Sequence, residues 1–462
     1  MKIDDPVQFV DQRTASAPLL KKALRYAFPD HWSFLLGEVA LYAFVVLIAT
    51  GTYLALFFEP SLSEHVYHGV YKPLQGETMS DAYRSAVDLS FEVKAGLLMR
   101  QTHHWAADVF VASIVVHVLR IFFTGAFRRP RELTYLIGLS ILFLSLLEGY
   151  LGYSMVDDLL SGMGLVIGYG VALSIPFVGG NLALLIWGAP YPGNDDFESR
   201  MFIGHVFIFP AILAALIGLH LALVALRHHT QWRGPRATQR RLIGVPAFPG
   251  QAPRSLGLMT ATAALLFGLG ALIQINPIWL WGPYETWLGT NGAQPDWYLG
   301  WLIGGLRLVP GFDVTVGNAT VIPNPFWGGA LFPLVVLGVM AAWPWAERRW
   351  RGDRASHNLL ERPRDAPGRT AFGAAFLTWV VLVFFAGSSD RLFVFLGLSY
   401  VAQVWFWRFA VWIVPLIVAV VVARWCRALQ RAEQIEAYQE EAMHEPEPAP
   451  TVTGSPDGTV PR

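Results

Sequence analysis

The stretch MRQTHHWAADVFVASIVVHVLRIFF, residues 99–123, decides the fold because it is apolar, long enough to cross a membrane and carries two widely spaced histidines. A second stretch, MFIGHVFIFPAILAALIGLHLALVAL at residues 201–226, repeats this arrangement. His103 precedes His117 by 14 residues, and His205 precedes His220 by 15. At about 1.5 Å per helical residue, each pair spans roughly 21–23 Å and faces broadly one side of its helix.

Two such helices packed antiparallel would present two pairs of opposed imidazoles at two depths. Opposed neutral imidazoles are the axial ligands that a six-coordinate haem iron requires. A single histidine on an apolar helix is more often a packed or hydrogen-bonded residue. Two pairs at nearly equal spacing favour ligands, because ionisable groups at membrane depth are costly and tend to be functional. The pattern therefore predicts two haems stacked across a membrane.

The composition, 54% hydrophobic and 15% charged over 462 residues, excludes an ordinary soluble enzyme. We predict an all-α membrane protein with eight transmembrane helices. The expected spans are residues 34–58, 101–123, 133–154, 201–226, 256–276, 327–346, 371–387 and 395–424. The further apolar stretch 166–188 contains glycines and Pro176, which favours an interfacial or re-entrant segment over a ninth span.

Cationic residues predict the orientation of these spans. They gather before the first span and after each even-numbered span, at Lys21, Lys22, Arg25, Arg128, Arg129, Arg131, Arg227, Arg233, Arg236, Arg240, Arg241, Arg348, Arg349, Arg351, Arg354, Arg424, Arg427 and Arg431. The other loops carry mostly acids, at Glu59, Glu64, Asp157, Asp158, Asp195, Asp196, Glu285 and Asp313. The positive-inside rule therefore predicts that both termini lie in the cytoplasm.

Five segments follow from this pattern. They are a cytoplasmic N-terminal segment (1–33), a dihaem four-helix bundle (34–226), a cytoplasmic linker (227–255), a C-terminal four-helix module with an outer loop (256–425), and a charged tail (426–462). The end of the tail cannot bury a core and is expected to be largely disordered. Cys426 is the single cysteine, so the haems would be held by coordination and packing, without covalent attachment.

Glycines repeat the histidine spacing on two other spans. Gly37 and Gly51 are 14 residues apart on the first, and Gly138 and Gly152 are 14 apart on the third. Glycine allows a backbone to approach a flat partner closely, although small residues also serve ordinary helix packing in membranes. The shared period favours a role in haem binding.

Arginines stand beside the histidines of the second span. Arg100 lies one turn before His103, and Arg120 lies three residues after His117. Both positions suit pairing with haem propionates. The alternative is an arginine that extends its guanidinium to the membrane interface.

These motifs together resemble cytochrome b of the quinol–cytochrome c reductase complexes. The resemblance is carried by Arg100-x-x-His103 with His117 and Arg120, His205 with His220, the paired glycines, the turn Gly152-Tyr153-Ser154 after the third span, and Pro295-Asp296-Trp297-Tyr298 on an outer loop. It covers about residues 30–425. The segments MRQTHHWAA, FFTGAFRRPREL and DDLLSG are similar to the actinobacterial branch, whose members oxidise menaquinol.

The resemblance implies two non-covalent b haems. His103 and His205 would hold the outer, low-potential haem, and His117 with His220 the inner, high-potential one. Quinol would be oxidised at the outer face; one electron would pass to a Rieske iron–sulfur protein and on to a c-type cytochrome. The other would cross both haems to a quinone on the cytoplasmic side.

The resemblance also implies roles for the outer loop. Asp296 would act as the proton acceptor, directly or through water, and Tyr298 would supply a hydrogen bond. The substrate-binding residues would be Pro295, Trp297, Tyr153 and Gly162. Arg227 and His228 are candidates for the inner quinone site, the alternative being a basic patch that only enforces topology.

The expected setting is a bacterial cell membrane, with a homodimeric core, lipid contacts and no nucleic-acid partner. Within the spans, His104 is turned about 100° from His103, which makes it a poor co-ligand. Asp108 is expected to be protonated, hydrogen-bonded or paired. Glu148 is either a proton-relay residue or a paired one.

Two other functions compete with this hypothesis. A dihaem membrane anchor of another quinone-linked oxidoreductase would not need the Pro-Asp-Trp-Tyr loop. A proton-relaying transporter would not need the glycine period.

Overall fold

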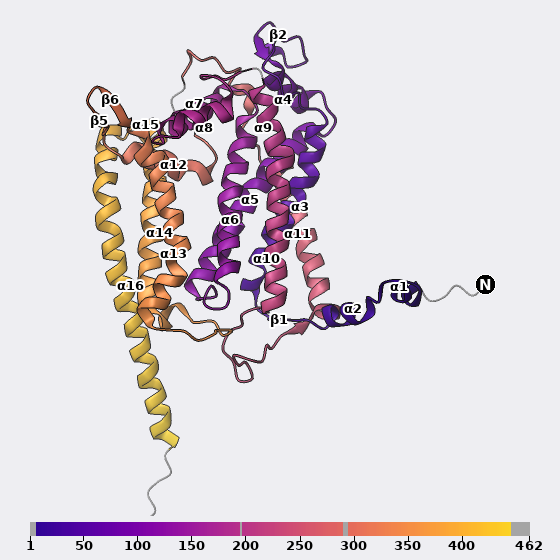
Figure 1. The fold of residues 1–462 in the computed structure, drawn as a ribbon, viewed down its shortest axis with the longest axis vertical. Helices are drawn as coiled ribbons and strands as arrows, with labels where there is room; N and C mark the ends of the chain where they lie inside the picture. The colour runs from indigo at the N-terminus through magenta and orange to yellow at the C-terminus, as the bar shows by residue number, and fades with distance from the viewer. Residues whose placement is uncertain (1–5, 195, 290–293, 445–462) are drawn as a thin grey trace, which may run out of the picture.

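The computed structural model describes residues 6–194, 196–289 and 294–444. Within these ranges eight helical segments are long and apolar enough to cross a membrane, and they run side by side (Figure 1). They are Trp32–Ala55, Gly96–Phe123, Glu132–Ser154, Phe197–Arg227, Ala247–Leu272, Phe326–Arg351, Pro367–Gly387 and Tyr400–Glu441. The predicted all-α membrane fold with eight spans is confirmed, and the protein is a multi-pass membrane protein.

The helices inside these segments are α3 (Leu36–Ala55), α5 (Gly96–Phe123), α6 (Glu132–Ser154), α9 (Phe197–Ile203) with α10 (Phe209–Arg227), α11 (Ala252–Leu272), α13 (Phe332–Arg351), α14 (Pro367–Gly387) and α16 (Tyr400–His444). Shorter helices are α1 (Pro6–Thr14), α2 (Ala17–Leu24), α4 (Asp81–Phe91), α7 (Leu159–Ser174), α8 (Gly179–Trp187), α12 (Gly300–Leu308) and α15 (Ser389–Leu396). Three two-stranded antiparallel pairs complete the described fold: β1 (Ala27–Phe28) with β4 (Val245–Pro246), β2 (Glu64–Val66) with β3 (Thr78–Ser80), and β5 (Val314–Val316) with β6 (Ala319–Ile322).

The apolar stretch 166–188 does not form a ninth span. It is divided between α7 and α8, which lie across the upper end of the bundle in Figure 1. Pro176 falls in the break between them. Asp158 caps the N-terminus of α7, because its side chain accepts a hydrogen bond from the backbone N–H of Ser161 at 2.8 Å.

Some predicted boundaries differ from the observed ones. The helix of the fifth span, α11, begins at Ala252, before residue 256, so the linker is shorter than predicted. The last span begins at Tyr400, because Gly397 with φ +65° separates α15 from α16. α16 then continues to His444, across the expected boundary at 426. Residues 445–462 of the expected disordered tail lie outside the described residues.

The fifth span does not pack with the C-terminal module to which the sequence assigned it. α11 packs against α3 and α5 and lies away from α13, α14 and α16 in Figure 1. Gly270 permits this contact, since a Cβ there would lie 2.4 Å from Oγ1 of Thr102. Gln101 also exchanges two 2.8 Å hydrogen bonds with the backbone of Ile275. The expected division at residues 227–255 is therefore not a division in packing.

The fourth span contains one wide turn. Gly204–Ile208 forms a π-helical turn between α9 and α10, and His205 lies within it. Pro210 lies two residues after this turn, and because its backbone nitrogen carries no hydrogen it cannot donate the hydrogen bond of a regular helix. The turn sets the direction of the His205 side chain.

Buried ion pairs join the helices at the lower end. Arg369 on α14 lies 2.8 Å from Glu347 on α13 and 2.7 Å from Glu361. Arg128, after α5, lies 2.8 Å from the same Glu361. Removing one member of such a cluster would leave a buried charge unpaired, which is strongly destabilising.

Candidate functional site

The outer histidine pair is brought together as the sequence predicts. His103 on α5 and His205 in the wide turn have ring centroids 6.2 Å apart and planes at 79°. Two ring nitrogens each about 2 Å from one metal ion would be about 4 Å apart, and adding the ring radii gives about 6 Å between centroids. The rings line a cavity of about 270 Å³.

Hydrogen bonds fix which nitrogen of each outer histidine faces the cavity. Nδ1 of His103 lies 2.9 Å from Oγ1 of Thr50, and Nδ1 of His205 lies 2.9 Å from Oε1 of Glu148. A metal-ligating histidine usually engages its second nitrogen in this way, which fixes the tautomer and ring orientation. Nε2 of each ring is thereby left available to bind a metal. Of the two roles that the sequence left open for Glu148, the contact shows the pairing, with His205.

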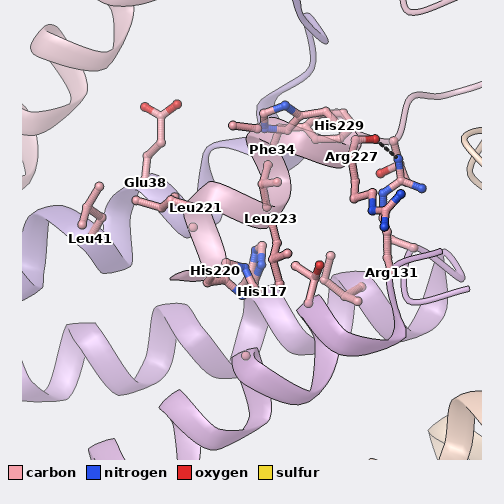
Figure 2. Close-up of a pocket in the computed structure, with 18 of the residues that line it drawn as sticks. Phe34, Glu38, Leu41, His117, Arg131, His220, Leu221, Leu223, Arg227 and His229 are labelled. Atoms are coloured by element: carbon pink, nitrogen blue, oxygen red, sulfur yellow. Dashed lines mark hydrogen bonds between the residues drawn. The ribbon is translucent and has the colours of Figure 1, made fainter. Parts of the chain in front are cut away.

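The inner histidines line a second cavity, of about 530 Å³ (Figure 2). His117 on α5 and His220 on α10 lie beside one another at its deep end. Their Nδ1 atoms are buried and have no hydrogen-bond partner among the described residues. The two pairs therefore differ in what supports their rings.

Each of the four glycines lies against one histidine ring. A Cβ on Gly37 or Gly138 would be 3.4 Å from Cε1 of His117 or His220, respectively. On Gly51 it would be 3.0 Å from Cε1 of His103, and on Gly152 only 2.4 Å from Cε1 of His205. The shared 14-residue period thus gives each imidazole its own space, most tightly at Gly152.

Both predicted propionate partners carry unpaired nitrogens beside the cavities. Nε of Arg100 is buried without a partner among the described residues, while its Nη2 donates to the carbonyl of Asn276 at 3.1 Å. Nε and Nη2 of Arg120 are likewise unpartnered in the described chain, and its guanidinium lies 4.2 Å over the ring of Phe34. Unpaired buried guanidinium groups suit an anionic partner.

These features fit two haems. In the described residues no group of three or more His, Cys, Asp or Glu side chains could hold a bare metal ion. A haem iron needs only two protein ligands, because its macrocycle supplies the other four. Opposed histidine pairs, glycines at the rings and unpaired arginines at each cavity are the donor set that such a group requires.

The outer cavity also contains the carboxylate of the Pro-Asp-Trp-Tyr loop. Oδ1 of Asp296 lies 2.6 Å from Nε2 of His104, and Oδ2 accepts a 2.9 Å hydrogen bond from the hydroxyl of Tyr298. Burial raises the pKa of Asp296, but His104 and the two hydrogen bonds outweigh it and hold the pKa below its usual range. Burial and Asp296 raise the pKa of Tyr298 well above its ordinary value. A fixed carboxylate therefore faces the cavity beside a protonated phenol.

Tyr153 joins this cavity but the other predicted substrate residues do not. Tyr153, Asp296 and Tyr298 line it together. Pro295, Trp297 and Gly162 are not among its lining residues. Gly162 instead accommodates the ring of Tyr284, which a Cβ would approach within 2.1 Å.

One local prediction was wrong. Gly152-Tyr153-Ser154 is not a turn after the third span but the last turn of α6. The helix includes these three residues and ends at Ser154, with Met155 as its C-cap. The hydroxyl of Tyr153 donates to the carbonyl of Leu160 at 2.8 Å, which ties the helix end to α7.

The mouth of the inner cavity carries polar groups. Arg227, His228 and His229 line it, as does Tyr26, whose hydroxyl lies 3.2 Å from Nδ1 of His229. Arg131 donates to the carbonyls of Arg227 and His228, each at 3.0 Å. Burial, with Arg120 and Arg131 nearby, lowers the pKa of His229 to about 4. His229 is thus a neutral imidazole near pH 7.

Sequence reasoning missed several of these residues. His104 was judged a poor haem ligand, because it is rotated by about 100° from His103 around the helix. The same rotation turns it toward Asp296. Thr50, next to Gly51, supports His103. At the inner cavity, Tyr26 and Arg131 were not assigned a role. Asp108 was expected to be protonated, hydrogen-bonded or paired; its side chain interacts with Trp297, while its buried Oδ1 has no partner among the described residues.

Comparison with known proteins identifies the family of the chain. The family model described as "Cytochrome b(N-terminal)/b6/petB" matches residues 108–283. The cytochrome bc1 complex cytochrome b subunit of Mycobacterium tuberculosis is 45% identical over 426 residues, which is 92% of this chain and 77% of that protein. The same subunit of Streptomyces coelicolor is 42% identical over 426 residues, covering 92% of this chain and 78% of that one.

A solved structure described as a hyperthermophilic respiratory Complex III has a similar fold. It superposes with a TM-score of 0.64 at 22% identity and covers 91% of this chain and 100% of its own. The sequence relatives are far more similar and extend over most of both proteins. The chain therefore belongs to the cytochrome b family of the cytochrome bc1 complex, together with actinobacterial members.

Proposed function

We propose that this protein oxidises quinol at its outer end, holding one b-type haem between His103 and His205 and another between His117 and His220. The supporting observation is that two opposed histidine pairs each have a glycine at every ring and, at the cavity, an arginine with at least one buried nitrogen that has no partner among the described residues. Bound haems would supply one-electron carriers at two depths of the membrane. Membership of the cytochrome b family agrees with haem binding.

Asp296 is the proton acceptor in this proposal. Its carboxylate faces the cavity that contains the outer histidines, so a quinol hydroxyl there could pass its proton to it. His104 and Tyr298 hold both carboxylate oxygens and limit their motion. Tyr298 remains a hydrogen-bond donor, because its pKa lies well above the working pH.

Quinone is reduced at the other end, near Arg227 and His228. The inner cavity extends from His117 and His220 to these residues. The neutral His229 and the hydroxyl of Tyr26 offer hydrogen bonds to a quinone oxygen. This placement favours a substrate site over a basic patch that only enforces topology.

The reaction requires partners. The chain has one cysteine, too few to hold an iron–sulfur cluster or to attach a c-type haem. One electron of each quinol therefore leaves through a Rieske iron–sulfur protein and a c-type cytochrome, and the other crosses the two haems. We further propose menaquinol as substrate, a homodimeric core with bound lipid in the bacterial cell membrane, and both termini in the cytoplasm.

The test uses the purified complex. Reduced-minus-oxidised spectra should give two b-type haems, with one lost in His117→Ala. Asp296→Asn should lower quinol oxidation on the order of 100-fold while both haems remain. Asp313→Asn, an exposed acid on the same loop, is the matched control and should oxidise quinol normally.

The alternative of a dihaem anchor predicts a different result. If Asp296→Asn and Tyr298→Phe together left the rate unchanged, the outer loop would not be a quinol site. Unchanged haem content in both His117→Ala and His220→Ala would contradict the ligand assignment.

A further inference from the structure

The two histidine pairs differ in one respect that bears on redox potential. Glu148 on α6 places Oε1 2.9 Å from Nδ1 of His205, and its backbone carbonyl lies 3.1 Å from the same nitrogen. The other ring, His103, has its Nδ1 2.9 Å from the hydroxyl of Thr50 and pairs with no carboxylate in the described chain. The outer pair therefore has one carboxylate-supported ligand.

The inner pair has no such support. Nδ1 of His117 and of His220 has no hydrogen-bond partner within the described residues. Of the described residues, Glu38 is the one acid that lines the inner cavity, and it is held elsewhere, by Tyr42 at 3.1 Å and Ser255 at 2.7 Å. The carboxylate contact distinguishes the outer site from the inner one.

Among the described residues, His205 is the polar group that the side chain of Glu148 contacts. Its side chain is only 15% exposed, and Oε2 is buried without a partner in the described chain. A carboxylate in such surroundings is costly unless it is paired, and His205 is the group that pairs with it. Gly152, one turn later, leaves room for that ring.

A carboxylate on the distal nitrogen makes an imidazole a stronger electron donor to its metal. A stronger donor stabilises the oxidised, more positive iron, and hydrogen bonding around the ligands is one way that proteins set haem potential. We propose that Glu148 is a positioning residue that orients His205 and lowers the midpoint potential of the outer haem relative to the inner one. This inference rests on the proposed function, because it takes His205 as an axial ligand.

The consequence is a direction for electron flow. A lower potential at the outer site makes transfer to the inner site favourable. The difference would come from one hydrogen bond on the protein side, since the other three rings lack a carboxylate partner in the described residues. Glu148 would thus contribute to the inward transfer of the electron that does not leave through the partner protein.

The test is a redox titration of the purified complex carrying Glu148→Gln. Glutamine keeps the length of the side chain and an acceptor oxygen but removes the carboxylate. The midpoint potential of the outer haem should rise while that of the inner haem stays unchanged. Glu132→Gln, at the opposite end of α6 and 3.8 Å from Arg348, is the matched control and should shift neither.

An unchanged or lower outer potential, or equal shifts of both haems, would overturn the proposal. If Glu148→Gln does not retain haem, the same redox titration is carried out on Glu148→Asp, and the outer midpoint potential should again rise alone. The shorter aspartate side chain moves the carboxylate away from His205. A different result would contradict the proposed function itself. That result is an optical spectrum of the unmodified complex without two b-type haem transitions, or a His205→Ala variant that keeps both haems.

Discussion

Nε2 of His104 lies 2.6 Å from Oδ1 of Asp296, and this contact joins the second span to the loop after the fifth. The two residues are 192 positions apart in the chain. With Tyr298 on the other oxygen, the carboxylate has little freedom to rotate away from the cavity.

The first prediction concerns this contact. His104→Leu removes the donor, so kcat/KM for quinol should fall about 10- to 100-fold, the usual range for hydrogen bonds to charged groups. His104→Gln keeps an N–H donor and should lose less. Haem spectra should be unchanged in both variants. Equal activity of the leucine variant and the unmodified protein would show that Asp296 does not depend on His104.

The second prediction compares two glycines. A Cβ at Gly152 would lie 2.4 Å from Cε1 of His205, whereas one at Gly138 would lie 3.4 Å from Cε1 of His220. Gly152→Ala should displace His205 and lower the haem-to-protein ratio, because overpacking typically costs about 1–3 kcal/mol. Gly138→Ala is the matched control and should keep both haems. Full haem content in Gly152→Ala would contradict the proposed close approach.

The third prediction is a pH dependence of stability. Burial is the main cause that raises the pKa of Asp157 to about 7. The folded protein then binds a proton that the unfolded chain releases near pH 4, so this group weakens stability as pH rises from about 4 to 7. Asp157→Asn should raise the unfolding temperature by a few degrees at pH 8.5 and have little effect at pH 4.5.

Asparagine is suitable here because Asp157 has φ +55°, a conformation that asparagine also tolerates. The measurement is thermal unfolding of the purified protein at both pH values, with the exposed Asp313→Asn as control. A gain in stability that is the same at both pH values would mean that the charge of Asp157 is not its cause.

The fourth prediction concerns orientation. In a Cys426→Ser background, a cysteine at exposed Arg240 should react with an impermeant thiol reagent only after the membrane is opened. A cysteine at exposed Thr315, between α12 and β6, should react in intact cells. The reverse pattern of labelling would invert the proposed topology.

The histidine pairs and the glycine period could be predicted because both depend on local helical geometry. Residues 14 apart on one helix share a face whatever surrounds it, so His103, His117, Gly37 and Gly51 could be placed without a structure. The same holds for the eight spans, whose length and apolar character are properties of single segments.

Contacts between distant segments could not be predicted in this way. The rotation of His104 away from His103 is local, but the presence of Asp296 in that direction depends on how the outer loop folds. The position of α11 against α3 and α5 depends on packing that no single helix encodes. Membership of the Pro-Asp-Trp-Tyr motif was also a poor guide to which residues line the cavity. Trp297 stands between Asp296 and Tyr298 in the sequence but does not line the cavity that they line.

The wide turn at Gly204–Ile208 accounts for the unequal spacing of the two histidine pairs. Fourteen residues of α-helix rotate through about 1400°, and fifteen through about 1500°. One π-helical turn takes up a single additional residue, so His220 returns to nearly the same angle from His205 as His117 has from His103. Deleting one residue between 206 and 208 should therefore leave a regular helix with both imidazoles in line, whereas a deletion between 212 and 216 should rotate His220 away. In effect, the two spans separate their histidines by the same number of helical turns. The fourth span has one additional residue between its histidines, and the π-helical turn accommodates it.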